Sequence, residues 1–104
     1  MYDTQTVREL NDRFRTSLKG GNIMITRGIA ARSDLDEIFR RIRSFDSFTQ
    51  DNNQENDFGA FEAGQDTVFW KIDYYSPDLS AGSEDPSNPA LTARVLTVML
   101  AEEY

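Results

Sequence analysis

Apolar residues recur at every third or fourth position near the start of the chain, with charged residues between them. This spacing is typical of an amphipathic helix that buries one face. It predicts a first helix over residues 4–18, which Gly20 and Gly21 end. Residues 22–26 are short, β-branched and apolar between glycines, and they predict a buried strand. The apolar positions of the helix are Val7, Leu10, Phe14 and Leu18.

A second helical pattern begins after Ser33, whose hydroxyl group suits an N-cap. Acidic residues fill the first turn and arginines the last, which complements the helix dipole. The inward stripe consists of Leu35, Ile38, Phe39, Ile42 and Phe45. The basic cluster consists of Arg40, Arg41 and Arg43. These arginines either complement the dipole or contact phosphate or an acidic partner.

Two aromatic-rich segments, residues 58–63 and 67–75, predict a β-hairpin around Gly64. Side chains of the second strand alternate between two faces. The face expected to meet the core carries Val68, Trp70, Ile72 and Tyr74, and the opposite face carries Phe69, Lys71, Asp73 and Tyr75. A three-residue loop puts Phe61 on the outer face with Phe69, whereas a two-residue loop puts it on the face of Trp70.

The remaining segments are a polar loop over residues 50–57, a turn-rich loop over residues 76–89 and a final helix. Asn88 caps this helix and Pro89 takes its first position. Its buried stripe comprises Leu91, Val95, Val98 and Met99, with Leu96 and Leu100 beside it. We therefore expect one α+β domain over residues 1–104, in the order αβαββα. Its three-stranded, largely antiparallel sheet carries helices mainly on one face.

Neither cysteine nor histidine occurs in the 104 residues. Disulfides, thiolate nucleophiles, cysteine-based zinc sites and histidine-dependent catalysis are therefore excluded. The first residues lack the basic start and apolar run of a signal peptide, and no apolar stretch approaches the ~20 residues of a membrane span. The sequence predicts a cytoplasmic protein without a cofactor and without membrane contact.

The net charge of −7 is unevenly distributed along the chain. Residues 1–48 hold nine basic and seven acidic side chains, a net of +2, and residues 49–104 hold two basic and eleven acidic ones, a net of −9. The acidic half repels nucleic acid and membrane phosphate and attracts a basic protein surface.

Five oxygen-bearing side chains follow the spacing of a calcium-binding EF-hand loop. They are Asp51, Asn53, Asp57, Glu55 and Glu62. Asn56 replaces the glycine that this loop requires at its sixth position, and Glu62 lies in a predicted strand where a helix should follow. We therefore expect no metal site.

No spacing requires a catalytic pair among the carboxylates Glu62, Asp73, Glu84 and Asp85, although two of them in one cleft suffice for glycoside hydrolysis. We expect no catalytic residue. A sheet covered on one side leaves aromatic side chains exposed on the other, which suits protein contact. The candidate partner surface comprises Phe61, Phe69, Tyr75, Asp73, Glu84 and Asp85.

Six segments carry a resemblance to a known family. They are residues 11–15 (NDRFR), 20–21 (GG), 57–62 (DFGAFE), 70–75 (WKIDYY), 82–89 (GSEDPSNP) and 94–104 (RVLTVMLAEEY). Over residues 7–104 the chain resembles a small bacterial family known as domain of unknown function family 3768. The resemblance implies a bacterial origin and no assigned activity, cofactor or catalytic residue. It also implies a histidine in many relatives where this chain has Asn56.

Three functional hypotheses follow. The first is a non-enzymatic bacterial accessory or regulatory protein that binds a protein partner. The second is an inhibitor from a mobile element, of the anti-CRISPR or anti-restriction type, whose acidic half mimics DNA in a defence nuclease. This hypothesis requires one contiguous acidic face. The third is a small carboxylate-based hydrolase, which requires a cleft with paired carboxylates and a raised acid pKa.

Overall fold

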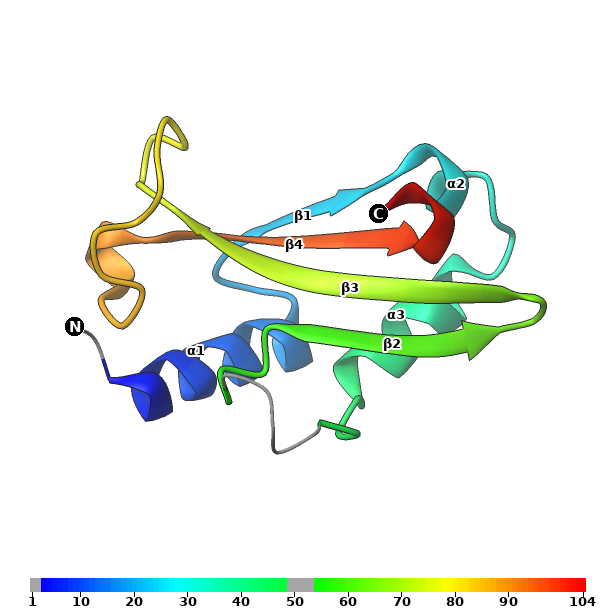
Figure 1. Cartoon of the computed structure of the whole chain (residues 1–104), viewed down its shortest axis with the longest axis horizontal. Helices are drawn as coiled ribbons and strands as arrows, with labels where there is room; N and C mark the ends of the chain where they lie inside the picture. The colour runs from blue at the N-terminus through cyan, green and yellow to red at the C-terminus, as the bar shows by residue number, and fades with distance from the viewer. Residues whose placement is uncertain (1–2, 49–53) are drawn as a thin grey trace.

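A four-stranded sheet forms the centre of the fold (Figure 1). The computed structural model describes residues 3–48 and 54–104. The strands are β1 (Asn22–Ile25), β2 (Phe58–Ala63), β3 (Asp66–Tyr75) and β4 (Ala93–Leu100), in the spatial order β1-β4-β3-β2. The β2–β3 and β3–β4 pairs are antiparallel, and β1 pairs with β4 in parallel. The α+β class is confirmed, but the sheet has one strand more than predicted.

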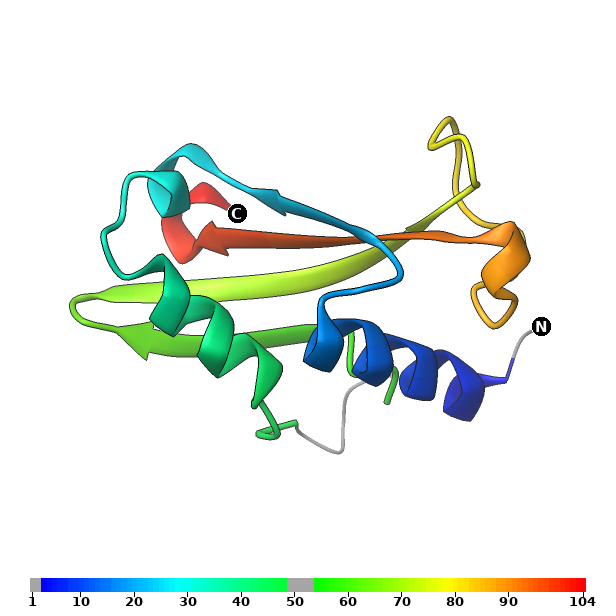
Figure 2. The same ribbon diagram turned by 180° about the vertical axis from the view of Figure 1, so that it is seen from behind.

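The helices cover one face of this sheet. They are α1 (Thr4–Ser17), the single turn α2 (Arg27–Ala30) and α3 (Leu35–Arg43), with two 3₁₀ turns, η1 (Pro89–Leu91) and η2 (Ala101–Glu103). Both ribbon views show α1 and α3 on the same side of the sheet (Figures 1 and 2). Asp3 caps α1 by accepting from the backbone N–H of Gln5. The N-cap of α3 is Asp34 and not the predicted Ser33. None of these helices, within the described ranges, has the length and apolarity needed to cross a membrane.

The predicted C-terminal helix is wrong, because most of this segment is strand β4. Asn88 does cap a helical turn and Pro89 is its first residue, but the turn ends at Leu91. Strand β4 lies between β1 and β3 and is largely buried on both faces. An apolar run that is buried on both faces has no period-two pattern, so its sequence also fits a helix. Pairing with two neighbouring strands favours the extended form, which suits the β-branched residues Val95, Thr97 and Val98.

Strand β1 confirms the prediction for residues 22–26, but its expected burial is wrong. All four of its residues are exposed, and Met24 reaches 59% exposure. The reason is its position, since β1 forms an edge of the sheet and only β4 pairs with it.

Trp70 lies at the centre of the core beneath the helices. Its side chain is fully buried, and the rings of Phe45 and Phe48 contact it edge-on at centroid distances of 5.5 and 6.0 Å. Gly59 pairs with Trp70 on the neighbouring strand. A Cβ atom at residue 59 would lie 2.3 Å from the indole nitrogen, so the ring occupies the space that any larger residue needs.

The hairpin turn decides the position of Phe61. Ala63 pairs with Asp66, so the loop contains only Gly64 and Gln65, and Gly64 has a φ of +64°. This is the two-residue alternative. Phe61 therefore pairs with Val68 and lies on the helix side, where it packs against the core. Its predicted place on the outer face is wrong because the loop is one residue shorter.

Replacing Gly59 with alanine should destabilise the fold by about 1–3 kcal/mol, because the added methyl group overlaps the Trp70 indole. Urea unfolding monitored by tryptophan fluorescence measures this change. Gly82→Ala is the matched control, since a Cβ at residue 82 meets nothing within 4 Å. Equal midpoints for the two variants would show that Trp70 does not fix the β2–β3 packing.

Candidate functional site

The sheet face opposite α1 and α3 carries an uncovered group of apolar side chains, which we call the open face. Phe69, Lys71, Asp73 and Tyr75 point to it from β3, as the alternation predicted. Phe58 takes the place predicted for Phe61, because it pairs with Lys71 on the same face. The Phe58 and Phe69 rings meet edge-on at 5.3 Å, and Tyr104 packs against Phe69 at 5.8 Å.

A depression of about 380 Å³ lies at the Tyr75 end of the open face. Met24 and Leu79, which are 59% and 51% exposed, form its apolar walls with Tyr75 and Val95. Lys71 and Asp73 lie in the depression and form an ion pair with a Nζ–Oδ2 distance of 2.9 Å. The hydrogen bond to Asp73 raises the pKa of Lys71. The depression therefore offers apolar contacts around a single paired cation.

The predicted partner surface comes together only in part. Phe69, Asp73 and Tyr75 share the open face. Phe61 lies on the opposite side, with the Arg41 guanidinium carbon 4.3 Å from its ring centroid. Glu84 and Asp85 lie in the loop after β3, where the Asp85 carboxylate accepts from the backbone N–H and the hydroxyl of Ser87. These bonds lower the pKa of Asp85.

A second cavity, of about 510 Å³, lies within the same loop, and Asp78 and Glu84 are among the residues that line it. The Asp78 carboxylate accepts from the hydroxyls of Ser76 and Ser80 and from the Ser80 backbone N–H. These bonds lower the pKa of Asp78 to about 2. A general acid needs a raised pKa, so this carboxylate does not favour acid catalysis.

The carboxylates of the acidic half are spread over the fold. Asp66 pairs with Arg32 at the hairpin end of the sheet, whereas Asp78 lies beyond the far end of β3. Glu103 accepts from the Thr26 hydroxyl and the Gly28 backbone N–H. Asp73 pairs with Lys71. Among the described residues, this arrangement does not favour the contiguous acidic face that a DNA mimic requires.

The predicted calcium spacing is tested only in part, because Asp51 and Asn53 lie outside the described residues. Glu62 accepts from the Thr67 hydroxyl on the strand pair. No group of three metal-binding side chains occurs in residues 3–48 and 54–104. Of the basic cluster, Arg40 pairs with Glu37 one helical turn away, and Arg41 donates to the Glu62 backbone carbonyl.

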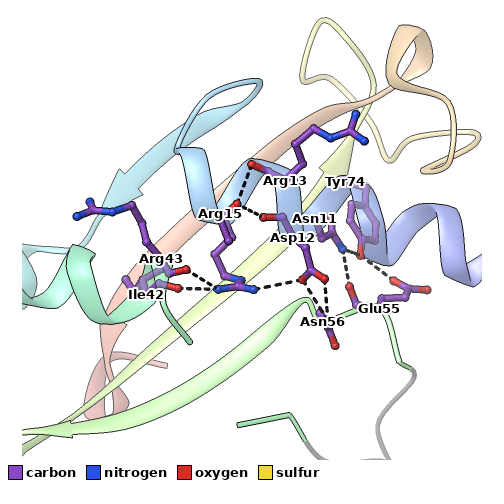
Figure 3. Close-up of polar contacts among 10 residues, drawn as sticks. Asn11, Asp12, Arg13, Arg15, Ile42, Arg43, Glu55, Asn56 and Tyr74 are labelled. Carbon is purple, nitrogen blue, oxygen red and sulfur yellow. Dashed lines mark hydrogen bonds and ion pairs between the residues drawn. The ribbon is translucent and has the colours of Figure 1, made fainter. Parts of the chain in front are cut away.

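A buried polar network beneath α1 was not predicted from the sequence (Figure 3). Asn11 has no exposed surface, and its Nδ2 donates to the Glu55 carbonyl at 2.9 Å and to the Tyr74 hydroxyl at 2.8 Å. The Tyr74 hydroxyl donates to Glu55 Oε1 at 2.7 Å. Arg94 Nε donates to Asn11 Oδ1 at 2.7 Å, and Arg94 Nη2 donates to the Pro86 carbonyl. One asparagine thus joins four segments of the chain.

The adjoining part of the network anchors α1 to α3 (Figure 3). Arg15 is 3% exposed and donates to the Ile42 carbonyl at 2.8 Å and to Asp12 Oδ1 at 3.2 Å. Asn56 Nδ2 donates to both Asp12 carboxylate oxygens, at 3.1 and 3.2 Å. The sequence does hold a signal for this network, since Asn11 lies four residues after Val7 and three before Phe14, within the apolar stripe.

Comparison with known proteins gives a family and no activity. Residues 4–103 match a family model described as Protein of unknown function (DUF3768). No curated protein and no solved structure matches the chain.

Replacing Tyr74 with phenylalanine should cost about 1–3 kcal/mol near pH 8, because it removes hydrogen-bond partners from Asn11 and Glu55. Burial, followed by the hydrogen bond to Glu55, raises the pKa of Tyr74. The folded state therefore keeps this proton while the unfolded chain loses it above about pH 10, so stability falls as the pH rises further.

The difference in unfolding free energy between the wild type and Tyr74→Phe should consequently narrow above about pH 10. Urea unfolding of both proteins from pH 8 to pH 11 measures it. A gap that stays constant over this range would contradict a buried, protonated Tyr74.

Proposed function

Because the chain belongs to the DUF3768 family, whose description assigns no activity, we propose a function from its own geometry: it is a binding module whose open face docks a protein partner. The observation that carries this proposal is the uncovered apolar surface of the sheet. Apolar side chains that are exposed together on one face mark interaction sites more often than single exposed apolar side chains do. Those of the open face are Met24, Phe58, Tyr75, Leu79 and Tyr104.

The charges around the open face favour a partner with a basic surface over a second copy of this chain. Glu62 and Asp73 lie on it, Asp78 directly precedes Leu79 of its depression, and its cation Lys71 is already paired with Asp73. Two such acidic rims repel one another, and the net charge of −7 adds to this repulsion. A partner with apolar anchors and a basic rim gains binding free energy from the apolar contacts and from charge attraction. Its association is also faster at low salt.

The rival functions have weaker support. The dispersed and largely hydrogen-bonded carboxylates give a DNA mimic no uniform acidic face among the described residues. The lowered pKa of Asp78 does not suit a hydrolase. We further propose that the module acts in a bacterial cytoplasm as an accessory or regulatory protein, since a chain without cysteine suits a reducing compartment.

Two variants of opposite charge at Leu79 test the docking face. Leu79→Glu and Leu79→Lys both remove the apolar contact, but only lysine opposes a basic partner, so the lysine variant should bind more weakly. We expect a loss of about tenfold or more for Leu79→Lys. The wild-type protein, immobilised, captures its partner from a lysate of the native host, and calorimetry with the purified partner then measures each affinity at low and high salt.

Gln5→Lys is the matched control, because Gln5 is exposed on α1 and lies on the other side of the sheet. This variant should retain the wild-type affinity. Equal affinities for all three variants, or binding that strengthens with salt, would contradict docking of a basic partner on the open face.

A further inference from the structure

A third cavity lies on the helix side of the sheet and differs in charge from the rest of the molecule. It has a volume of about 220 Å³ and lies where the end of α1, the following turn, η1 and the start of β4 meet. Arg13, Lys19 and Arg94 contribute to its lining, and none of its lining residues is acidic. A chain with a net charge of −7 therefore places three cations around one small cavity.

These cations have no carboxylate partner among the described residues. Arg13, Lys19 and Arg94 each lack an ion pair within that part of the chain, whereas Arg15, Arg32, Arg40 and Lys71 are each in at least one. Arg13 and Lys19 are exposed and free to turn toward a ligand. A solvated lysine or arginine without an ionic partner is ordinary, whereas Arg94 is buried.

Arg94 is a buried part of the cavity wall and is held there by hydrogen bonds. It is 5% exposed, and its Nε and Nη2 atoms are bonded to the Asn11 side chain and the Pro86 carbonyl, which are both neutral. No hydrogen bond joins Nη1 to the described residues. The Glu55 carboxylate attracts Arg94 without a direct hydrogen bond between them among the described residues, and the guanidinium carbon lies 5.2 Å from the Tyr74 ring centroid. A buried cation held by neutral acceptors has unused capacity for an anion.

We propose that this cavity binds a small phosphate monoester. Two guanidinium groups and an ammonium group suit the several oxygens of a phosphate, which arginine bonds in bidentate fashion. They outweigh the opposing partial charge of about half a unit at the C-terminal end of α1. Leu10, Phe14 and Pro89 line the cavity and offer an apolar wall to a short carbon chain. The cavity volume of about 220 Å³ has room for a phosphate with a body of a few carbons.

Calorimetric titration with defined probes tests the proposal. The probes are inorganic phosphate, n-propyl phosphate, propionate and n-propanol. We expect saturable binding of both phosphates, with n-propyl phosphate about three- to tenfold tighter because its chain contacts the apolar wall. We expect no saturable binding of n-propanol. Tighter binding of propionate than of n-propyl phosphate, or no saturable binding of either phosphate at millimolar concentration, would overturn the proposal.

Substitutions at the exposed cations locate the site without disturbing the core. Arg13→Gln and Lys19→Gln should each weaken n-propyl phosphate binding about five- to twentyfold, since each removes one charge-assisted hydrogen bond. Arg27→Gln is the control, because it makes the same change in net charge at an exposed position outside the cavity lining. An equal loss in the control would show non-specific electrostatics and overturn the site.

Discussion

The buried Arg94 side chain imposes the constraint on which the arrangement of the helices depends. Its guanidinium lies inside the fold and makes its two hydrogen bonds only when α1 presents Asn11 and the loop before η1 presents the Pro86 carbonyl. Leaving a buried cation without hydrogen bonds costs several kcal/mol, so these elements are positioned together. Asn11 extends the same constraint to Tyr74 in β3 and to Glu55. Arg15 then holds α3 against α1.

This arrangement gives the two sides of the sheet different chemistry. The helices α1 and α3 cover the inward side chains of β3 and β4, and outward side chains of β3, including Phe69 and Tyr75, lie on the face that neither helix covers. The open face combines apolar groups with the carboxylates of Glu62 and Asp73, whereas the helix side carries the unpaired cations Arg13 and Lys19 beside Arg94. The net charge of −7 alone does not reveal that acidic and basic groups lie on different sides of the sheet. The proposed partner and the proposed phosphate therefore bind to different sides of the sheet.

Local patterns in the sequence predicted the elements whose periodicity is clear, and long-range contacts explain the rest. Alternation placed Phe69, Asp73 and Tyr75 on one face, because half-buried strands keep a period of two. Strand β4 lacks that period, since it is buried on both faces, and was mistaken for a helix. The sheet face on which Phe61 lies depended on a single residue in the hairpin loop. The bond between Asn11 and Arg94 joins positions 83 residues apart, and no local pattern reports such a pairing.

A double-mutant cycle between Asn11 and Arg94 measures directly whether the buried arginine organises the fold. Unfolding free energies of Asn11→Ala, Arg94→Met and the double variant give the coupling between the two side chains. We expect a coupling of at least about 1 kcal/mol, because each single substitution leaves a buried polar partner unsatisfied while the double substitution removes both. Additive effects within about 0.5 kcal/mol would contradict a fold organised around the buried arginine.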